Sequence, residues 1–270
     1  MCRVLDVSRS GYYVWRRRGE STRAKANRGL VERIRAVHAR SRQTYGSPRV
    51  HVDLREEGLV CGRHRVARLM RICRIQGLRR RHPKRATGTT HGRLGAENLL
   101  GQQFYVKRPN QVWAGDITTL WTGSGWLYLA VVMDLYSRSI IGWAMSNRMT
   151  EQLAMDALTM ALERRRPSEG LLHHSDQGSQ YASEKFQRLL TEHGIRCSMS
   201  RKGNCYDNAC VESFFSTLKT ELIRRHRYAT REVARAEIFE YIEAFYNRQR
   251  RHSTLGYKAP AEYELMNDVA

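Results

Sequence analysis

The stretches "QVWAGDITTLW" (Gln111–Trp121) and "GWLYLAVVMDLYSRSIIGWAMS" (Gly125–Ser146) decide the fold of this chain. Both are rich in Trp, Tyr, Val and Ile, the residue types that suit a pleated strand, and the turn signal "TGSG" separates them. This pattern predicts three strands that follow one another as an antiparallel meander.

Helices and strands alternate after the meander. A helix capped by Thr150 is predicted first, and "LLHHSD" (Leu171–Asp176) predicts a short buried strand. "SEKFQRLLTEHG" (Ser183–Gly194) then predicts a helix, and "IRCSMS" (Ile195–Ser200) a further strand. The chain therefore predicts an α/β domain with a mixed five-stranded sheet flanked by helices. The segment 231–264 predicts one more helix and a basic tail turn.

The charge of the chain is concentrated in its first part. The 270 residues carry a formal net charge of +21; residues 1–100 hold 25 basic and 7 acidic side chains, and residues 101–270 hold 22 and 19. Such an excess favours a polyanionic partner. A membrane surface is the alternative, but the sequence has no long apolar run and no lipidation signal. We therefore expect nucleic acid as a partner and no membrane.

Two short helices around a tight turn are predicted within the basic part. The first of the two has Ser47 as its expected N-cap and Pro48 at its first position. Ser8 is the expected N-cap of a separate small helix nearer the start of the chain. A second helix follows in 62–77, with apolar side chains inward and arginines outward. The inward set is Val66, Leu69, Met70 and Cys73, and the outward set is Arg63, Arg65, Arg68 and Arg71.

This arrangement is typical of a helix-turn-helix, although the basic face of an ordinary three-helix bundle is the alternative. Because the charge is of one sign, we favour DNA contact. The predicted domains are a small all-α, basic helix-turn-helix region at 1–77, a basic linker at 78–104, and an α/β core with a C-terminal helix at 105–265.

The six cysteines form no CxxC pair, which favours reduced thiols and a cytoplasmic location. Cys61 and His64 have ligand-like spacing, but no second pair follows at zinc-finger distance. A zinc site is therefore not expected.

Three carboxylates stand out by their positions. Asp116 lies within a strand otherwise suited to burial, Asp176 closes the strand "LLHHSD", and Glu212 lies beside the apolar stripe of a helix. Carboxylates brought together repel one another unless a divalent cation neutralises them. Oxygen ligands suit Mg²⁺ or Mn²⁺, and two such ions catalyse phosphoryl transfer without a nucleophilic side chain. These residues predict a metal-dependent site acting on DNA.

Other polar residues receive more ordinary interpretations. Asp207 is the expected N-cap of the helix that carries Glu212, and Asp134 is expected to make a turn or pair with Arg138 more readily than to bind metal. For His173, His174 and Gln177, which flank Asp176, the interpretations are support of that metal-binding acid or contact with the DNA backbone, and alternatively packing of a histidine at the end of the strand. The tryptophans are expected in the core or on the sheet surface instead of stacking on bases: Trp113, Trp121, Trp126 and Trp143.

Several motifs carry a resemblance. Asp116 and Asp176 are separated by 59 residues, and Asp176 and Glu212 by 35. The surrounding motifs are "HSDQGSQY", "KGNCYDNACVESFFSTLKTE" and "YNRQRRHSTLGYKAP". With these motifs the chain resembles the retroviral-integrase-like DDE transposases of bacterial insertion sequences, and in particular the downstream (OrfB) product of elements that encode the transposase in two overlapping frames.

The resemblance implies a ribonuclease-H-like core in which Asp116, Asp176 and Glu212 bind two Mg²⁺ ions, with Mn²⁺ as a substitute. It also points to Lys219 as a DNA contact, and helical spacing places Asn208 and Ser216 on the same face. A solvated lysine, paired with Glu221 or with nothing, is the alternative for Lys219. The expected DNA contacts are Lys219, Asn208, Arg63, Arg65, Arg68, Arg201 and Lys202.

The expected function is therefore DNA strand cleavage and strand transfer at the ends of an insertion element. The alternatives are a DNA-binding regulator with an inactive integrase-like core, and a ribonuclease-H-like nuclease without strand transfer. The expected partners are double-stranded DNA (element ends and target), further copies in an oligomer on that DNA, and the product of the upstream reading frame, to which the chain is fused or with which it cooperates. We expect the bacterial cytoplasm, at the nucleoid, as its location.

Overall fold

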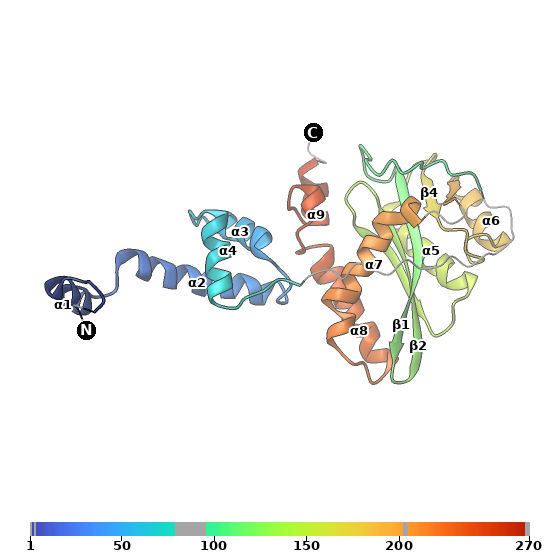
Figure 1. Cartoon of the computed structure of the whole chain (residues 1–270). Coiled ribbons are helices and arrows are strands. Elements are labelled where there is room, and N and C mark those ends of the chain that lie inside the picture. Colours follow the sequence, from blue (N-terminus) through green and yellow to red (C-terminus); the bar gives the residue numbers. More distant parts are fainter. Residues whose placement is uncertain (1, 3, 79–95, 202–204, 268–270) are drawn as a thin grey trace. The chain divides into compact units, whose positions relative to one another are not determined.

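The computed structural model describes residue 2 and residues 4–78, 96–201 and 205–267, which fall into two compact units, Met1–Leu78 and Arg79–Ala270 (Figure 1). Most of the predicted linker, 79–95, lies outside the described residues. Each unit has its own buried core and is described separately.

The N-terminal unit is helical. Its elements are α1 (Arg9–Arg17), α2 (Thr22–Arg40), α3 (Ser47–Glu56) and α4 (Arg63–Ile72). Ser8 caps α1 as predicted, because its hydroxyl accepts the N–H of Gly11 at 3.1 Å. The prediction for α3 was wrong by one residue: Gly46 is the N-cap, and Ser47 already lies in the helix. Apolar side chains from α2, α3 and α4 form the core, among them Ile34, Val37, Val50, Leu54, Val66 and Leu69.

The second unit contains the predicted mixed sheet. Its strands are β1 (Val112–Thr122), β2 (Gly125–Asp134), β3 (Ile140–Ser146), β4 (Leu172–Ser175) and β5 (Arg196–Met199), in the order β3-β2-β1-β4-β5. The first three strands pair antiparallel, as the predicted meander requires, whereas β4 runs parallel to both β1 and β5. β1 therefore lies in the centre of the sheet.

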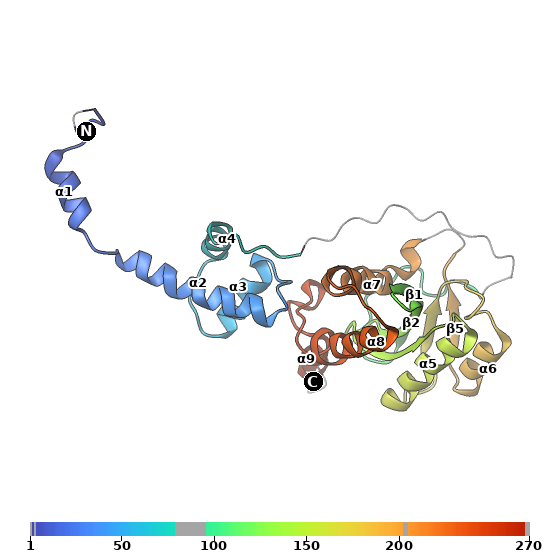
Figure 2. The same ribbon diagram turned by 90° about the horizontal axis from the view of Figure 1, so that it is seen from below.

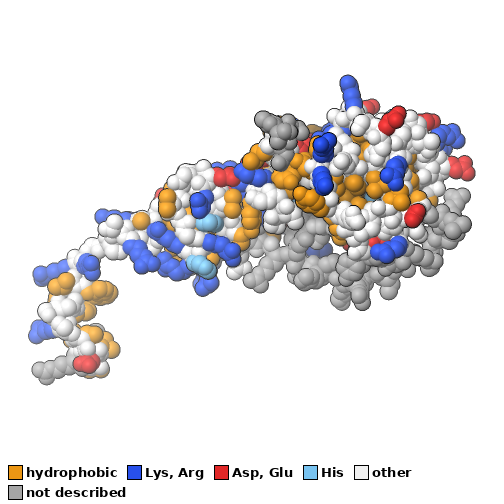
Figure 3. Space-filling view, turned by 90° about the horizontal axis from the view of Figure 1, so that it is seen from above, with side chains coloured by type: hydrophobic (Ala, Val, Ile, Leu, Met, Phe, Trp, Pro, Cys, Tyr) orange, Lys and Arg blue, Asp and Glu red, His pale blue; other side chains and the backbone are white. Residues whose placement is uncertain are grey.

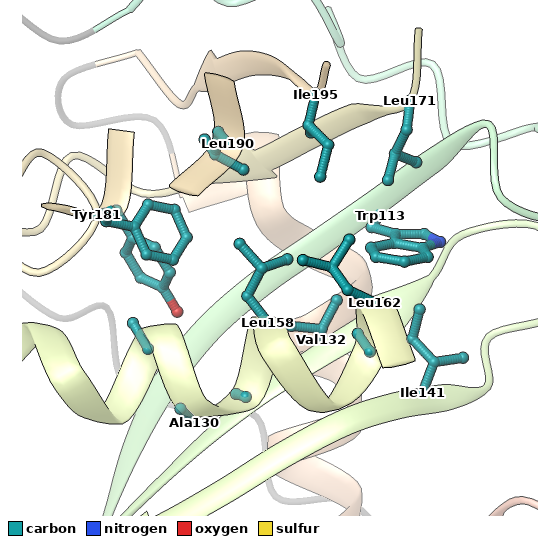
Figure 4. Packing of buried hydrophobic residues seen from close by; sticks show 14 of the residues in the cluster. Trp113, Ala130, Val132, Ile141, Leu158, Leu162, Leu171, Tyr181, Leu190 and Ile195 are labelled. Atoms are coloured by element: carbon teal, nitrogen blue, oxygen red, sulfur yellow. The ribbon is translucent and has the colours of Figure 1, made fainter. Parts of the chain in front are cut away.

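Helices cover both faces of the sheet. The helices α5 (Glu151–Arg165) and α6 (Glu184–Glu192) lie on one face, and α7 (Ala209–Glu221) and α8 (Arg231–Glu240) lie on the other (Figure 2). Under α5, Leu158 and Leu162 pack against Trp113, Val132 and Ile141 of the strands (Figure 4). Burial of this apolar surface is the main force that holds the layers together.

The C-terminal segment differs from its prediction as one helix and a tail turn. After α8 the chain makes a π-helical turn at Tyr241–Tyr246 and a 3-10 turn at Ser253–Leu255, and α9 (Pro260–Asn267) is the last of the described elements. Gly256, whose φ is +61°, follows the 3-10 turn, and Pro260 begins α9 at a position where a proline is well tolerated.

The tryptophans lie where they were expected. Trp113 is fully buried, Trp121 and Trp126 form an edge-to-face pair on the sheet surface, and the indole of Trp143 donates to Glu243 at 2.7 Å. The five cysteines whose side chains are described carry free thiols. Among the described residues, none of the helices has the length and apolar character needed to span a bilayer.

Candidate active site

Asp116 occupies the central strand β1. Its Oδ1 accepts the N–H of Ile117 at 2.7 Å, and some of its side chain reaches the surface. Shielding by surrounding protein atoms, together with the carboxylates of Asp176 and Glu212, raises the pKa of Asp116 to about 8, while the N–H of Ile117 and the ammonium of Lys219 oppose this shift. The three predicted carboxylates therefore interact electrostatically, with Asp116 as the most strongly perturbed.

The sheet register explains why Asp176 comes near Asp116. Ala114 of β1 is level with His174 of β4, and the two acids each lie two residues further along their parallel segments. Asp176 immediately follows β4, where its Oδ1 accepts the N–H of Gly178 at 3.0 Å. Although the Asp176 side chain is exposed on one side, shielding by neighbouring protein atoms raises the pKa of its carboxylate. The carboxyl end of a parallel strand is a common position for functional residues in such sheets.

Glu212 lies in the first turn of α7 and reaches the surface on one side. Neighbouring protein atoms still shield its carboxylate enough to raise its pKa. The apolar side chains Val211, Phe214 and Leu218 are buried and hold α7 against the sheet. This packing explains why Glu212 lies at the edge of an apolar stripe: the stripe orients the helix that carries the carboxylate.

Lys219 lies on α7 about two turns beyond Glu212 and is half-buried. Burial and the guanidinium of Arg224 lower the pKa of Lys219, whereas the carboxylate of Asp116 opposes them. Glu221 was one candidate partner for this lysine, but its carboxylate instead forms a buried ion pair with Arg250. Lys219 therefore belongs to the electrostatic surroundings of Asp116.

Asp207 is not the helix N-cap that was predicted, because Asn208 occupies that position. Asp207 is buried, and it accepts hydrogen bonds from the side chains of Asn98 and Gln102 at 2.8 Å and from the N–H of Arg201 at 2.9 Å. Although burial opposes them, the hydrogen bonds of Arg201 and Gln102 lower the pKa of Asp207 to about 2. The guanidinium of Arg201, an expected DNA contact, is thus paired with Asp207 at 3.3 Å.

Asn208 was expected to share a DNA-facing surface with Glu212 and Lys219, and this expectation was wrong. The Asn208 side chain is buried, and its Nδ2 donates to the carbonyl oxygen of Gly115 at 3.1 Å. Asn208 precedes α7 and has non-helical dihedral angles, so helical spacing does not fix the direction of its side chain. The residue connects α7 to β1 instead of facing solvent.

The other residues that were expected to contact DNA differ in their exposure to solvent. Arg63 and Arg68 of α4 are exposed, whereas Nε of Arg65 donates to Asn27 at 2.9 Å and joins α4 to α2. Lys202 lies outside the described residues. On the face of the molecule that Figure 3 shows, Lys and Arg side chains cover the N-terminal helices, while the second unit displays both signs of charge.

Two further polar residues singled out in the sequence, Asp134 and His174, have structural roles. Asp134 makes a turn, as one alternative had it: its carboxylate accepts the N–H groups of Asn110 at 2.8 Å and Tyr136 at 2.9 Å. His174 is buried between the hydroxyls of Ser198 and Ser200, at 2.9 and 3.1 Å. These contacts support packing of the histidine over a role at the DNA backbone.

Sequence reasoning missed Tyr181, the last residue of "HSDQGSQY". This tyrosine is buried, and burial together with the carboxylates of Asp116 and Asp176 raises the pKa of its phenol. Tyr181 therefore stays protonated beside the acidic cluster. Its proximity to Asp176 in the motif was the signal that could have identified it.

The donor set fits hard divalent cations, because three carboxylates interact and one of them is strongly shielded from solvent. Within the ranges that the structure describes, no three His, Cys, Asp or Glu side chains are close enough to form a finished coordination group. The chemistry of the donors thus favours an all-oxygen metal site, although the side chains do not form its geometry.

Comparisons with known proteins identify the domains and the family of this chain. Two models described as "Integrase core domain" match residues 106–205 and 193–260, and one described as "HTH-like domain" matches residues 25–83. The "Transposase InsF for insertion sequence IS3A" of Escherichia coli K12 is 49% identical over 99% of this chain and 93% of its own length. An "Insertion element IS600 uncharacterized 31 kDa protein" of Shigella sonnei is 46% identical over 97% of both chains.

A solved structure supports the fold alone. The cryo-EM structure of a simian T-cell lymphotropic virus intasome, in complex with a PP2A regulatory subunit, contains a chain that is 18% identical with a TM-score of 0.51, covering 85% of this chain and 73% of that one. Since the sequence relatives span nearly the whole length, the chain belongs to the insertion-sequence transposases that include InsF, enzymes with an HTH-like domain and an integrase core domain.

Proposed function

We propose that this transposase cleaves a DNA strand at each end of its insertion element and joins the freed 3′-hydroxyl to target DNA, with Asp116, Asp176 and Glu212 as its catalytic residues. The observation that carries the proposal is the electrostatic coupling of Asp116 to the other two carboxylates. A carboxylate whose pKa is raised by burial and by neighbouring carboxylates, as that of Asp116 is, is typical of a functional site.

The cofactor in this proposal is Mg²⁺, two ions in each site, with Mn²⁺ as a substitute. The three carboxylates would hold the ions, which supply an activated water or 3′-hydroxyl and stabilise the leaving oxygen of a phosphodiester. A different element of the fold holds each carboxylate. Asp116 lies in the central strand, Asp176 lies in the tight turn that follows a buried strand, and Glu212 lies on a helix packed against the sheet.

The DNA contacts complete the proposal. Lys219 lies along α7 from Glu212 and provides a positive charge for a phosphate of the flanking backbone. Arg63 and Arg68 form an exposed basic surface on α4, the second helix of the predicted helix-turn-helix. The partners of this transposase would be duplex DNA at the element ends and the target, further copies of this chain, and the upstream reading-frame product. It would act at the nucleoid in the bacterial cytoplasm.

A strand-transfer assay tests the proposal. The full chain is incubated with Mg²⁺ and a labelled duplex that carries an element end, and the products are resolved on a denaturing gel. Joined strands longer than the substrate are expected. Cleavage without joining would favour the nuclease alternative, and DNA binding without cleavage would favour the regulator with an inactive core.

A further inference from the structure

Gly115, the residue immediately before Asp116, is contacted from two directions. Its carbonyl oxygen accepts the Nδ2 hydrogen of Asn208 at 3.1 Å. A Cβ atom at this position would lie only 2.9 Å from Nε2 of His173 and 3.4 Å from a ring carbon of Tyr181. Since His173, Tyr181 and Asn208 are all buried, the backbone before Asp116 has little freedom to shift.

The Asn208 contact is a short connection between two catalytic acids. Asn208 is the N-cap residue of α7, and Glu212 follows it by one helical turn. Gly115 is bonded directly to Asp116. A single hydrogen bond between residues 93 positions apart thus joins the strand that carries one carboxylate to the helix that carries another.

Ordinary helix capping does not account for this side chain. An asparagine at the N-cap normally uses its oxygen to accept an N–H from the first turn, but Asn208 makes no such bond. Its Oδ1 atom is buried without a hydrogen-bond partner among the described residues. The Asn208 side chain therefore does not cap its own helix. Its hydrogen bond goes to the backbone of β1 instead.

The neighbouring residue already anchors the start of the helix. Asp207 is held by Asn98, Gln102 and the backbone of Arg201, none of which belongs to β1. The start of α7 thus has its own attachment to the rest of the fold. What Asn208 adds is a link to the strand of Asp116.

We propose that Asn208 is a positioning residue that sets the separation of Asp116 and Glu212 through Gly115 and thereby tunes the affinity of the site for divalent cations. This inference rests on the proposed function, because it assumes that these two carboxylates share the metal site. Residues that orient the metal ligands without binding the metal themselves typically contribute 10- to 100-fold to metal affinity or activity.

The test is direct binding of Mn²⁺ to the full chain without DNA, followed by the loss of the free-ion signal in electron paramagnetic resonance. Asn208→Leu keeps the approximate volume of the side chain and removes the donor. Asn247→Leu is the matched control, because Asn247 is equally buried and donates to and accepts from the backbone of Ile140 at 2.9 Å. Asp116→Asn identifies the binding that belongs to the catalytic site.

We expect the dissociation constant for Mn²⁺ to rise about 10-fold or more in Asn208→Leu and to stay within about twofold of wild type in Asn247→Leu. Asn208→Ala repeats the test with a smaller side chain. Equal Mn²⁺ affinity in wild type and both Asn208 variants would overturn the inference while leaving the proposed function intact. Failure of both Asn208 variants to fold would also overturn it, because the residue would then be structural. If wild type bound no Mn²⁺ through Asp116, the proposed metal site itself would fall.

Discussion

Arg250 and Glu221 form a buried, two-pronged ion pair. Nε of Arg250 donates to Oε2 of Glu221 at 2.8 Å and Nη2 donates to Oε1 at 2.7 Å, with both side chains only 7% exposed. The hydroxyl of Tyr241 donates to the same carboxylate at 2.8 Å. The pair joins the end of α7 to the segment between the π-helical turn and α9, so it fixes the helix that carries Glu212 and Lys219.

Removing one partner of this pair is expected to destabilise the protein strongly. Arg250→Leu removes the guanidinium that neutralises the buried carboxylate of Glu221, which should lower the free energy of unfolding by about 3–5 kcal/mol. Urea denaturation checks the value. Arg164→Leu is the control, because its ion pair with Glu243 is more exposed and should contribute at most about 1 kcal/mol. Equal losses in the two variants would contradict this account.

Lys219 is expected to hold DNA and not metal. Lys219→Ala should weaken DNA binding and strand transfer at subsaturating DNA, because it removes a charge placed for a backbone phosphate, while Mn²⁺ affinity stays unchanged. Lys219→Arg should be tolerated because it keeps the charge. Fluorescence anisotropy with a labelled element end measures the binding. Wild-type binding and transfer in Lys219→Ala would return this lysine to the role of a solvated side chain.

Arg63 and Arg68 are expected to contact phosphates. Each contact releases counterions, so Arg63→Ala and Arg68→Ala should each reduce the slope of log affinity against log salt concentration by about 1. Affinities measured for the full chain at several salt concentrations give the slope. Arg188→Ala on α6 removes an exposed arginine of the second unit and serves as the control. Unchanged slopes in both α4 variants would argue against DNA contact by this helix.

Asp134 should make stability depend on pH. Burial raises the pKa of Asp134 to about 6 despite the hydrogen bonds from Asn110 and Tyr136. A carboxyl whose folded-state pKa lies above its unfolded value contributes most below pH 4, and the contribution is lost as the pH rises through 6. Relative to Asp134→Asn, wild type should therefore lose about 2 kcal/mol of unfolding free energy between pH 4 and pH 7. A constant difference over this range, in urea titrations, would refute the shift.

The strands could be predicted from the sequence, and Asp116, Asp176 and Glu212 could be singled out as candidates, because these signals are local or depend on spacing. Trp, Tyr, Val and Ile in β1 and β2 mark strands wherever they occur, and the apolar positions of α7 recur at helical period. Asp116 is conspicuous because an acid within such a strand is costly unless a partner compensates it. These features do not depend on how distant segments meet.

Asp207 and Asn208 show where sequence reasoning stops. Asp207 has the residue type of an N-cap, but its partners Asn98 and Gln102 lie more than 100 positions away and outweigh the local preference. Asn208 lies one residue before α7 and is not helical. The prediction treated it as part of the helix and therefore assigned its side chain the wrong direction. The π-helical turn at Tyr241–Tyr246 was missed for a related reason, since it breaks the helical period that a sequence pattern can reveal.

We propose that Asp116, Asp176 and Glu212 act together in strand transfer. The direct test is the yield of joined strands from an end-bearing duplex and Mg²⁺, compared among wild type, Asp116→Asn, Asp176→Asn, Glu212→Gln and the double variant Asp116→Asn/Glu212→Gln. Unfolding curves and DNA affinity measured beside the yields show that each variant is folded and binds DNA.

We expect every single variant to form no joined product while keeping the fold and nearly wild-type DNA affinity. The double variant should be no worse than the singles, because the effects of residues that act as one unit are not additive. Full strand transfer by a folded variant that lacks any one of the three carboxylates would contradict the proposal.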